Sequence, residues 1–100
     1  MYKKGRSCVD GILVVKACKT DLATVRFGLV ISKRVGNSVV RNKVRRRLKS
    51  IIQAMSIEGA YDIVIIARHN IASVRYDSMH KSLCNLLIQA GALKAETLYV

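Results

Sequence analysis

Lysine and arginine dominate the segment from residue 32 to residue 49, which holds eight basic residues and no aspartate or glutamate. Arginine can hold a phosphate through two parallel hydrogen bonds, and lysine binds one as a compact point charge. The chemistry that this segment offers is therefore the binding of a polyanion. The candidate contact residues are Lys33, Arg34, Arg41, Asn42, Lys43, Arg45, Arg46, Arg47 and Lys49.

The spacing of these charges argues against a surface that is merely solvated. Arg41 and Arg45, like Lys43 and Arg47, are four residues apart, where two like charges on a helix cost about 0.2–0.5 kcal/mol. No acid lies close enough in the sequence to compensate. A nucleic acid is favoured over an anionic membrane, because the segment has no Trp or Phe to anchor in a lipid interface.

Residues that could act as catalysts or metal ligands are scattered. A magnesium or zinc site needs several carboxylates or histidines close together. His69 and His80 are isolated, and a lone histidine is usually a surface or core residue. We therefore assign no catalytic residue, metal ligand or cofactor to the protein itself. The acids are Asp10, Asp21, Glu58, Asp62, Asp77 and Glu96.

The basic segment is predicted to continue into a helix over residues 37–56. Gly36, Asn37 and Ser38 are typical of a turn followed by a helix cap. Aliphatic residues then recur at helical spacing and form one apolar face, with Arg41 at its edge. The residues of this face are Val40, Val44, Leu48, Ile51, Ile52 and Met55.

The remaining pattern predicts strands, a second helix and short connections. Strands are expected at 9–18, 24–33 and 61–67, with the first two joined by a connection of hairpin length and paired antiparallel. A loop at 68–74 precedes a helix at 75–90, which ends at Gly91. We expect one α+β domain over residues 1–100, with a flexible tail at 92–100.

Composition is that of a globular protein, with 51% apolar residues and a net charge of +12. No stretch is long enough to span a bilayer, and the N-terminus lacks the apolar core of a signal peptide. Cys8, Cys18 and Cys84 are odd in number and widely spaced, so we expect reduced thiols, with Cys18 and Cys84 filling the core. These features predict a cytoplasmic protein.

The residues from Arg26 to Lys49 resemble the signature of the bacterial ribonuclease P protein subunit. In that family a strand ends in Ser-Lys-Lys/Arg-x-Gly and leads to Ala/Ser-Val-x-Arg-Asn-Arg/Lys at the start of a basic helix. Residues 61–68 and 83–87 also resemble the following strand and the last helix. The resemblance implies a two-layer, ribosomal-protein-like fold: a mixed sheet with helices packed on it. It also implies a left-handed crossover through the basic helix.

The resemblance further implies a role in removing the 5′ leader from precursor tRNA. In the family, a catalytic RNA holds Mg²⁺ and performs the hydrolysis, while the protein binds that RNA and the leader. The basic residues named above would face RNA. Tyr2, Lys16 and Arg41 would line a leader cleft between the sheet and the basic helix. The family usually begins with a further helix, and this chain starts near the end of it.

Three other functions are compatible with parts of the pattern. A ribosomal or other structural RNA-binding protein would share the composition but have no processing role. A DNA-binding helix is disfavoured, because a helix that buries one face on a sheet does not project into a major groove. An autonomous nuclease would require an active site that the residues do not reveal. We therefore expect neither DNA nor a membrane as a partner.

Overall fold

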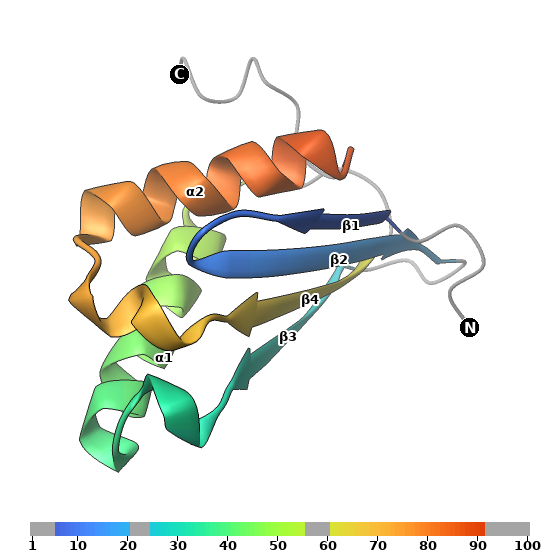
Figure 1. Ribbon diagram of the computed structural model, residues 1–100. Helices are drawn as coiled ribbons and strands as arrows, with labels where there is room; N and C mark the ends of the chain where they lie inside the picture. The colour runs from blue at the N-terminus through green and yellow to red at the C-terminus, as the bar shows by residue number, and fades with distance from the viewer. Residues whose placement is uncertain (1–5, 21–24, 56–60, 92–100) are drawn as a thin grey trace.

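The computed structural model describes residues 6–20, 25–55 and 61–91. Within these ranges, four strands form a mixed sheet and two α-helices cover one of its faces (Figure 1). The arrangement is the predicted α+β fold of two layers. The elements in chain order are β1 (Arg6–Val9), β2 (Leu13–Lys19), β3 (Arg26–Ile31), η1 (Lys33–Val35), α1 (Ser38–Gln53), β4 (Tyr61–Ala67), η2 (His69–Ser73) and α2 (Tyr76–Gln89).

The strand order is β1-β2-β4-β3, so the predicted antiparallel pair of the first two long strands is wrong. β4 lies between them, antiparallel to β2 and parallel to β3. The β-branched run of β4 explains this order, because a strand that is apolar on both faces is best placed at the centre of a sheet. The connection after β2 is therefore not a hairpin between neighbours.

β3 and β4 are parallel neighbours, and the chain passes between them through α1. This connection is the crossover through the basic helix that the resemblance implied (Figure 1). At the start of both strands, the Arg26 guanidinium donates two hydrogen bonds of 2.7 Å to the Asp62 carboxylate. This ion pair holds the pKa of Asp62 below its usual range.

β1 is a strand that the sequence pattern did not predict. It pairs antiparallel with β2 through a turn that Asp10 stabilises, since its carboxylate accepts the amides of Ile12 and Leu13 at 2.9 Å. The other carboxylate oxygen accepts a hydrogen bond from the Ser82 hydroxyl of α2. Asp10 therefore attaches the β1–β2 turn to the helix layer.

The core fills the space between the sheet and the two helices. Leu13, Val15 and Ile65 from the sheet contribute to one buried cluster with Leu48 of α1 and Leu83 of α2. Cys84 belongs to this cluster, and burial raises the pKa of its thiol. Cys18 is also buried, as predicted, but lies outside the cluster.

The second helix covers Tyr76–Gln89, within one residue of the predicted bounds 75–90 at each end, and Gly91 has the left-handed conformation after its C-terminal end. The segment expected as a loop contains the short 3₁₀-helix η2. α1 ends at Gln53, before the predicted end at residue 56. The tail at 92–100 lies outside the described residues. Among the helices that the structure describes, none is long and apolar enough to cross a membrane.

Candidate nucleic-acid interface

The N-terminal end of α1 is built by the sequence Gly36-Asn37. Gly36 has φ +156°, and a Cβ atom there would lie 2.8 Å from Cγ1 of Val40. Asn37 is the predicted cap, and its Oδ1 accepts the amide of Val40 at 3.0 Å. These two residues fix where α1 begins, and therefore where its basic side chains stand relative to the sheet.

The apolar face of α1 turns toward the sheet, as predicted. Val44, Leu48 and Ile51 are buried, while Val40 and Ile52 are partly buried against the same core. Burying such aliphatic side chains contributes about 1.5–3 kcal/mol each, which exceeds the repulsion among the charges on the other side. The fold can therefore present a strongly one-signed surface on a stable helix.

Four predicted residues line an open hollow on the outer side of α1. Asn42, Arg45, Arg46 and Lys49 line it together with Val39, and the hollow has a volume of about 440 Å³. Nη1 of Arg45 lies 3.4 Å from Oδ1 of Asn42. We call this the α1 hollow. It brings three cationic groups and one amide around a single concave surface, which suits the phosphates of a polyanion.

Arg41 occupies the predicted edge of the apolar face. Its side chain is half-buried, and its Nε atom is inaccessible to solvent and without a hydrogen-bond partner in the described structure. Nη2 lies 3.4 Å from the Ser38 hydroxyl. Its guanidinium is thus partly held by the protein before any ligand binds.

The other predicted basic residues lie outside the α1 hollow, before it in the chain or on other sides of the helix. Lys33 and Arg34 are exposed in η1, just before α1. Lys43 is exposed and Arg47 is half-buried, and helix geometry places both on the side of α1 away from Arg45. The basic segment therefore forms a surface around the helix, with the α1 hollow as its concave part.

Two of the three predicted leader-cleft residues, Lys16 and Arg41, lie on different elements and at opposite faces of the sheet. Lys16 is exposed in β2, and its neighbours Val15 and Ala17 are buried on the helix side. Alternation therefore places Lys16 on the open face of the sheet, while Arg41 belongs to α1 on the other face. Tyr2 lies outside the described residues, so the grouping of the three stays a prediction.

The open face of the sheet carries a row of aliphatic side chains. Strand register aligns Val9, Val14, Ile66 and Val30 across all four strands. Val9 and Val30 are 55% and 48% exposed. Sequence reasoning did not identify this row, because it depends on β1 and on the strand order.

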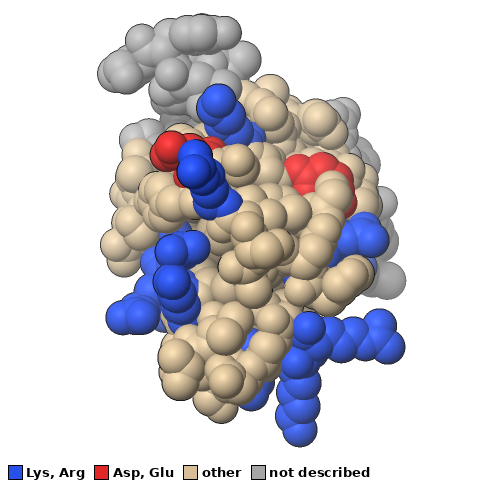
Figure 2. Space-filling view, turned by 60° about the vertical axis from the view of Figure 1, so that its left-hand side comes forward, with Lys and Arg blue, Asp and Glu red and all other residues tan. Residues whose placement is uncertain are grey.

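The charges are unevenly distributed over the molecule. Figure 2 shows Lys and Arg side chains spread over one face and projecting mainly from its lower half, while the acids visible there lie in the upper half, beside some of the basic side chains. Two acids interact with residues outside α1: Asp62 forms an ion pair with Arg26, and Asp10 accepts a hydrogen bond from Ser82. Within the described ranges, no three His, Cys, Asp or Glu side chains gather as a metal site would require.

Sequence reasoning missed one residue of the α1 hollow. Val39 is 76% exposed, and it was assigned neither to the apolar face of the helix nor to the candidate contact residues. It stands on the basic side of the helical wheel, outside the apolar face, and this position was the available signal. His69 is exposed, His80 lies 3.7 Å from the Cys84 thiol, and neither histidine lines the α1 hollow.

The chain is similar to ribonuclease P proteins in sequence and in fold. The family described as Ribonuclease P matches residues 1–91. A relative from Clostridium botulinum, named Ribonuclease P protein component, is 37% identical over 94 residues, covering 91% of this chain and 85% of the relative. One from Oceanobacillus iheyensis with the same name is 38% identical, covering 93% of this chain and 79% of the relative.

Solved structures of ribonuclease P proteins show the same similarity in fold. The RNase P protein from Staphylococcus aureus superposes with a TM-score of 0.80 at 30% identity, covering 92% of this chain and 86% of that protein. The RNase P protein from Thermotoga maritima gives 0.77 at 28% identity, covering 87% and 84%. The similarity therefore extends across the sheet and both helices.

Proposed function

The chain belongs to the ribonuclease P protein family, and from that premise we propose how it serves this endoribonuclease as the RNA-binding subunit. The enzyme removes the 5′ leader from precursor tRNA. The protein binds the catalytic RNA and the substrate, and it performs no bond cleavage itself. Hydrolysis, with the Mg²⁺ that it requires, belongs to the RNA.

The α1 hollow is the observation that carries this proposal. Its concave surface presents two guanidinium groups, one ammonium group and one amide, and no described acid lines it. These groups belong to Arg45, Arg46, Lys49 and Asn42. Arginine and lysine bind phosphate oxygens through charge-assisted hydrogen bonds, which are stronger than neutral ones. The protein would thereby neutralise backbone phosphates where catalytic RNA and substrate approach one another.

Arg41 is proposed to contact RNA at the edge of this surface. Its Nε has no partner in the described structure, and its Nη2 bond to Ser38 is long at 3.4 Å. A phosphate in reach of the guanidinium would supply stronger partners. Lys33, Arg34, Lys43 and Arg47 extend the charge on either side. Lys16 and Tyr2 remain candidates for contact with the 5′ leader.

A cytoplasmic location is part of the proposal. All three cysteines are free thiols, and such usage favours a reducing compartment. Precursor tRNA is the proposed substrate, and the proposed partner is the catalytic RNA of the same organism. Duplex DNA and membranes are not expected to bind specifically.

Reconstitution with the catalytic RNA tests the function. We expect the protein to increase cleavage of precursor tRNA at limiting Mg²⁺, and we expect protein without RNA to leave the substrate intact. Arg45→Ala and Lys49→Ala should weaken binding, whereas Lys81→Ala on α2 removes the same charge at an exposed site outside the hollow. A structural RNA-binding protein would bind without stimulating cleavage, and that result would refute the processing role.

A further inference from the structure

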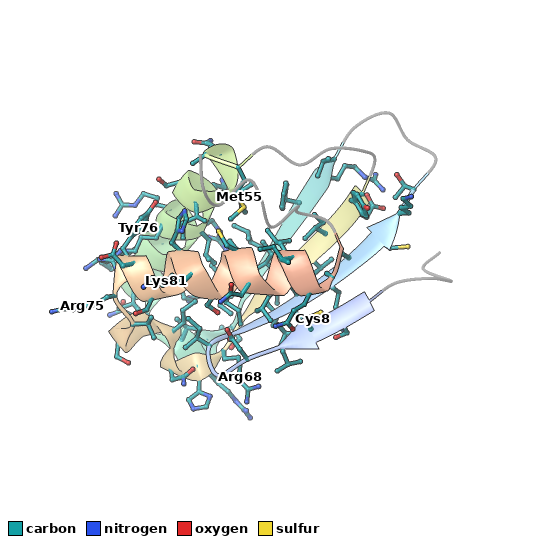
Figure 3. All side chains as sticks on the ribbon, turned by 90° about the horizontal axis from the view of Figure 1, so that it is seen from above. Cys8, Met55, Arg68, Arg75, Tyr76 and Lys81 are labelled. Carbon is teal, nitrogen blue, oxygen red and sulfur yellow. The ribbon has the colours of Figure 1, made fainter. Side chains whose placement is uncertain are left out.

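An exposed aromatic ring stands at the junction of the two helices. Tyr76 is the first residue of α2 and is 38% exposed, which makes it the most exposed aromatic side chain in the described part of the chain. Its hydroxyl lies 3.1 Å from the Ser50 hydroxyl of α1. Figure 3 shows Tyr76 between the two helices at the end where α2 begins.

Ser50 connects this ring to the basic surface of α1. Residues three and four positions apart are neighbours on a helix, so Arg46 and Arg47 are the preceding neighbours of Ser50. Arg75 precedes Tyr76 directly, and its side chain projects outward in Figure 3. The one acid in the first turn of α2 is Asp77. The ring is therefore joined through Ser50 to the arginine-bearing side of α1, and it directly follows Arg75 in the chain.

Resting on the proposed function, we infer that Tyr76 stacks on an unpaired base of the RNA whose phosphates α1 binds. A tyrosine ring beside arginines is the combination that proteins use for single-stranded nucleotides, with stacking for the base and cations for the backbone. The bond to Ser50 holds the ring before RNA arrives, which lowers the entropy lost on binding. A paired base within a helix could not reach the ring face, so the partner is an unpaired nucleotide.

The sequence contains no tryptophan, so Tyr76→Trp introduces a single indole as a probe. Catalytic RNA and precursor tRNA are added in two separate titrations. The RNA whose base stacks on the indole should quench the indole fluorescence. The RNA that quenches identifies the source of the base. Asn85→Trp is the matched control, because Asn85 is exposed on the opposite side of α2, about two and a half turns further on. Quenching by neither RNA, or equal quenching at both positions, would overturn the inference.

Substitutions that keep or remove the ring provide a second measurement. Tyr76→Phe keeps the ring and should bind RNA nearly as wild type, whereas Tyr76→Leu should bind about 5- to 140-fold more weakly. Ser50→Ala removes only the hydroxyl contact and should not reproduce the loss seen with leucine. If Tyr76→Leu binds RNA as wild type does, the stacking role is refuted.

The two proposals fail in distinguishable ways. Arg46→Ala tests phosphate binding without touching the ring. Arg46→Ala could weaken RNA binding while the indole fluorescence of Tyr76→Trp is not quenched. In that case RNA binding by the basic surface is supported and only the stacking contact is wrong. If the protein binds neither RNA at all, the proposed function itself fails.

Discussion

The arginines of α1 differ in how far their guanidinium groups are already buried or hydrogen-bonded within the protein. Arg41 is half-buried and its Nε atom is shielded from solvent, and Arg45 contacts Asn42, while Arg46 is exposed and lines the α1 hollow. An exposed arginine without an acidic partner contributes little to the fold and keeps its donors available for phosphate. Arg46 is therefore the residue at which binding and stability can be separated most cleanly.

Arg46→Ala should leave the melting temperature unchanged or slightly higher. The substitution relieves repulsion with neighbouring cations and replaces arginine by a good helix former. Binding to catalytic RNA should weaken by about 1.5–3 kcal/mol if the guanidinium makes a charge-assisted bond. Thermal melting measures the stability and titration with catalytic RNA measures the affinity, with Lys81→Ala as the control for loss of one charge. Equal effects of the two variants on affinity would contradict a specific contact.

The carboxylate of Asp10 should make stability fall in acid. Burial raises its pKa, but the hydrogen bonds from Ser82, Ile12 and Leu13 outweigh this and lower the pKa below the ordinary value of 3.8. A lowered folded pKa means that this stabilisation is complete above the unfolded pKa. It is lost as pH falls from near 4 through the folded value.

Asp10→Asn should remove that contribution. The asparagine oxygen can still accept the turn amides, but no charge strengthens the contact with Ser82. The difference in unfolding free energy between wild type and variant should shrink as pH falls below 4. Denaturation at a series of pH values measures it, and a difference that is independent of pH would contradict the assignment.

At the scale of single elements, the entry to α1 depends on one glycine. Gly36 combines a backbone conformation that other residues rarely adopt with a Cβ position 2.8 Å from Val40. Gly36→Ala should destabilise the protein by about 1–3 kcal/mol, the usual cost of such backbone strain. Chemical denaturation would show it as a lower midpoint.

Gly28→Ala is the matched control for Gly36. It replaces a glycine whose nearest foreign atom would be 3.9 Å away, in ordinary van der Waals contact. If both substitutions cost the same, the conformation at Gly36 is not what requires glycine there.

The elements near the basic segment could be predicted from local signals. Asn37, the apolar period of α1 and Gly91 each act within one or two turns, and the structure places all three as expected. The strand order could not be predicted in this way, because it depends on which strand is apolar on both faces and on pairing between distant segments. The turn at Asp10 was missed although its signal is local, because Asp10-Gly11 is a typical turn dipeptide and Asp10 accepts the amides of Ile12 and Leu13. Only the contact of Asp10 with Ser82 depends on a residue remote in sequence.

The residues of the candidate site likewise include some that local sequence patterns predict and some that depend on contacts between distant elements. Asn42, Arg45, Arg46 and Lys49 are brought together because they share one side of a single helix, which periodicity reveals. Lys16 and Arg41 are on different elements, and the grouping predicted for them rested on resemblance rather than on contacts. Tyr76 meets Ser50 only through the packing of α1 against α2, so no local pattern pointed to that pair.

At the scale of the whole molecule, the net charge of +12 should govern how affinity depends on salt. If about five phosphates are neutralised, log K should fall against log salt with a slope of roughly −3.5 to −4.5, because each neutralised phosphate releases condensed counterions. Replacing Arg45, Arg46 and Lys49 together by alanine should reduce the magnitude of the slope by roughly 2–3. Three charges removed outside the hollow, at Lys19, Arg68 and Lys81, should change it less. Titrations of catalytic RNA across a salt series measure both slopes. A wild-type slope near zero, or equal changes for the two triple variants, would contradict phosphate binding centred on α1.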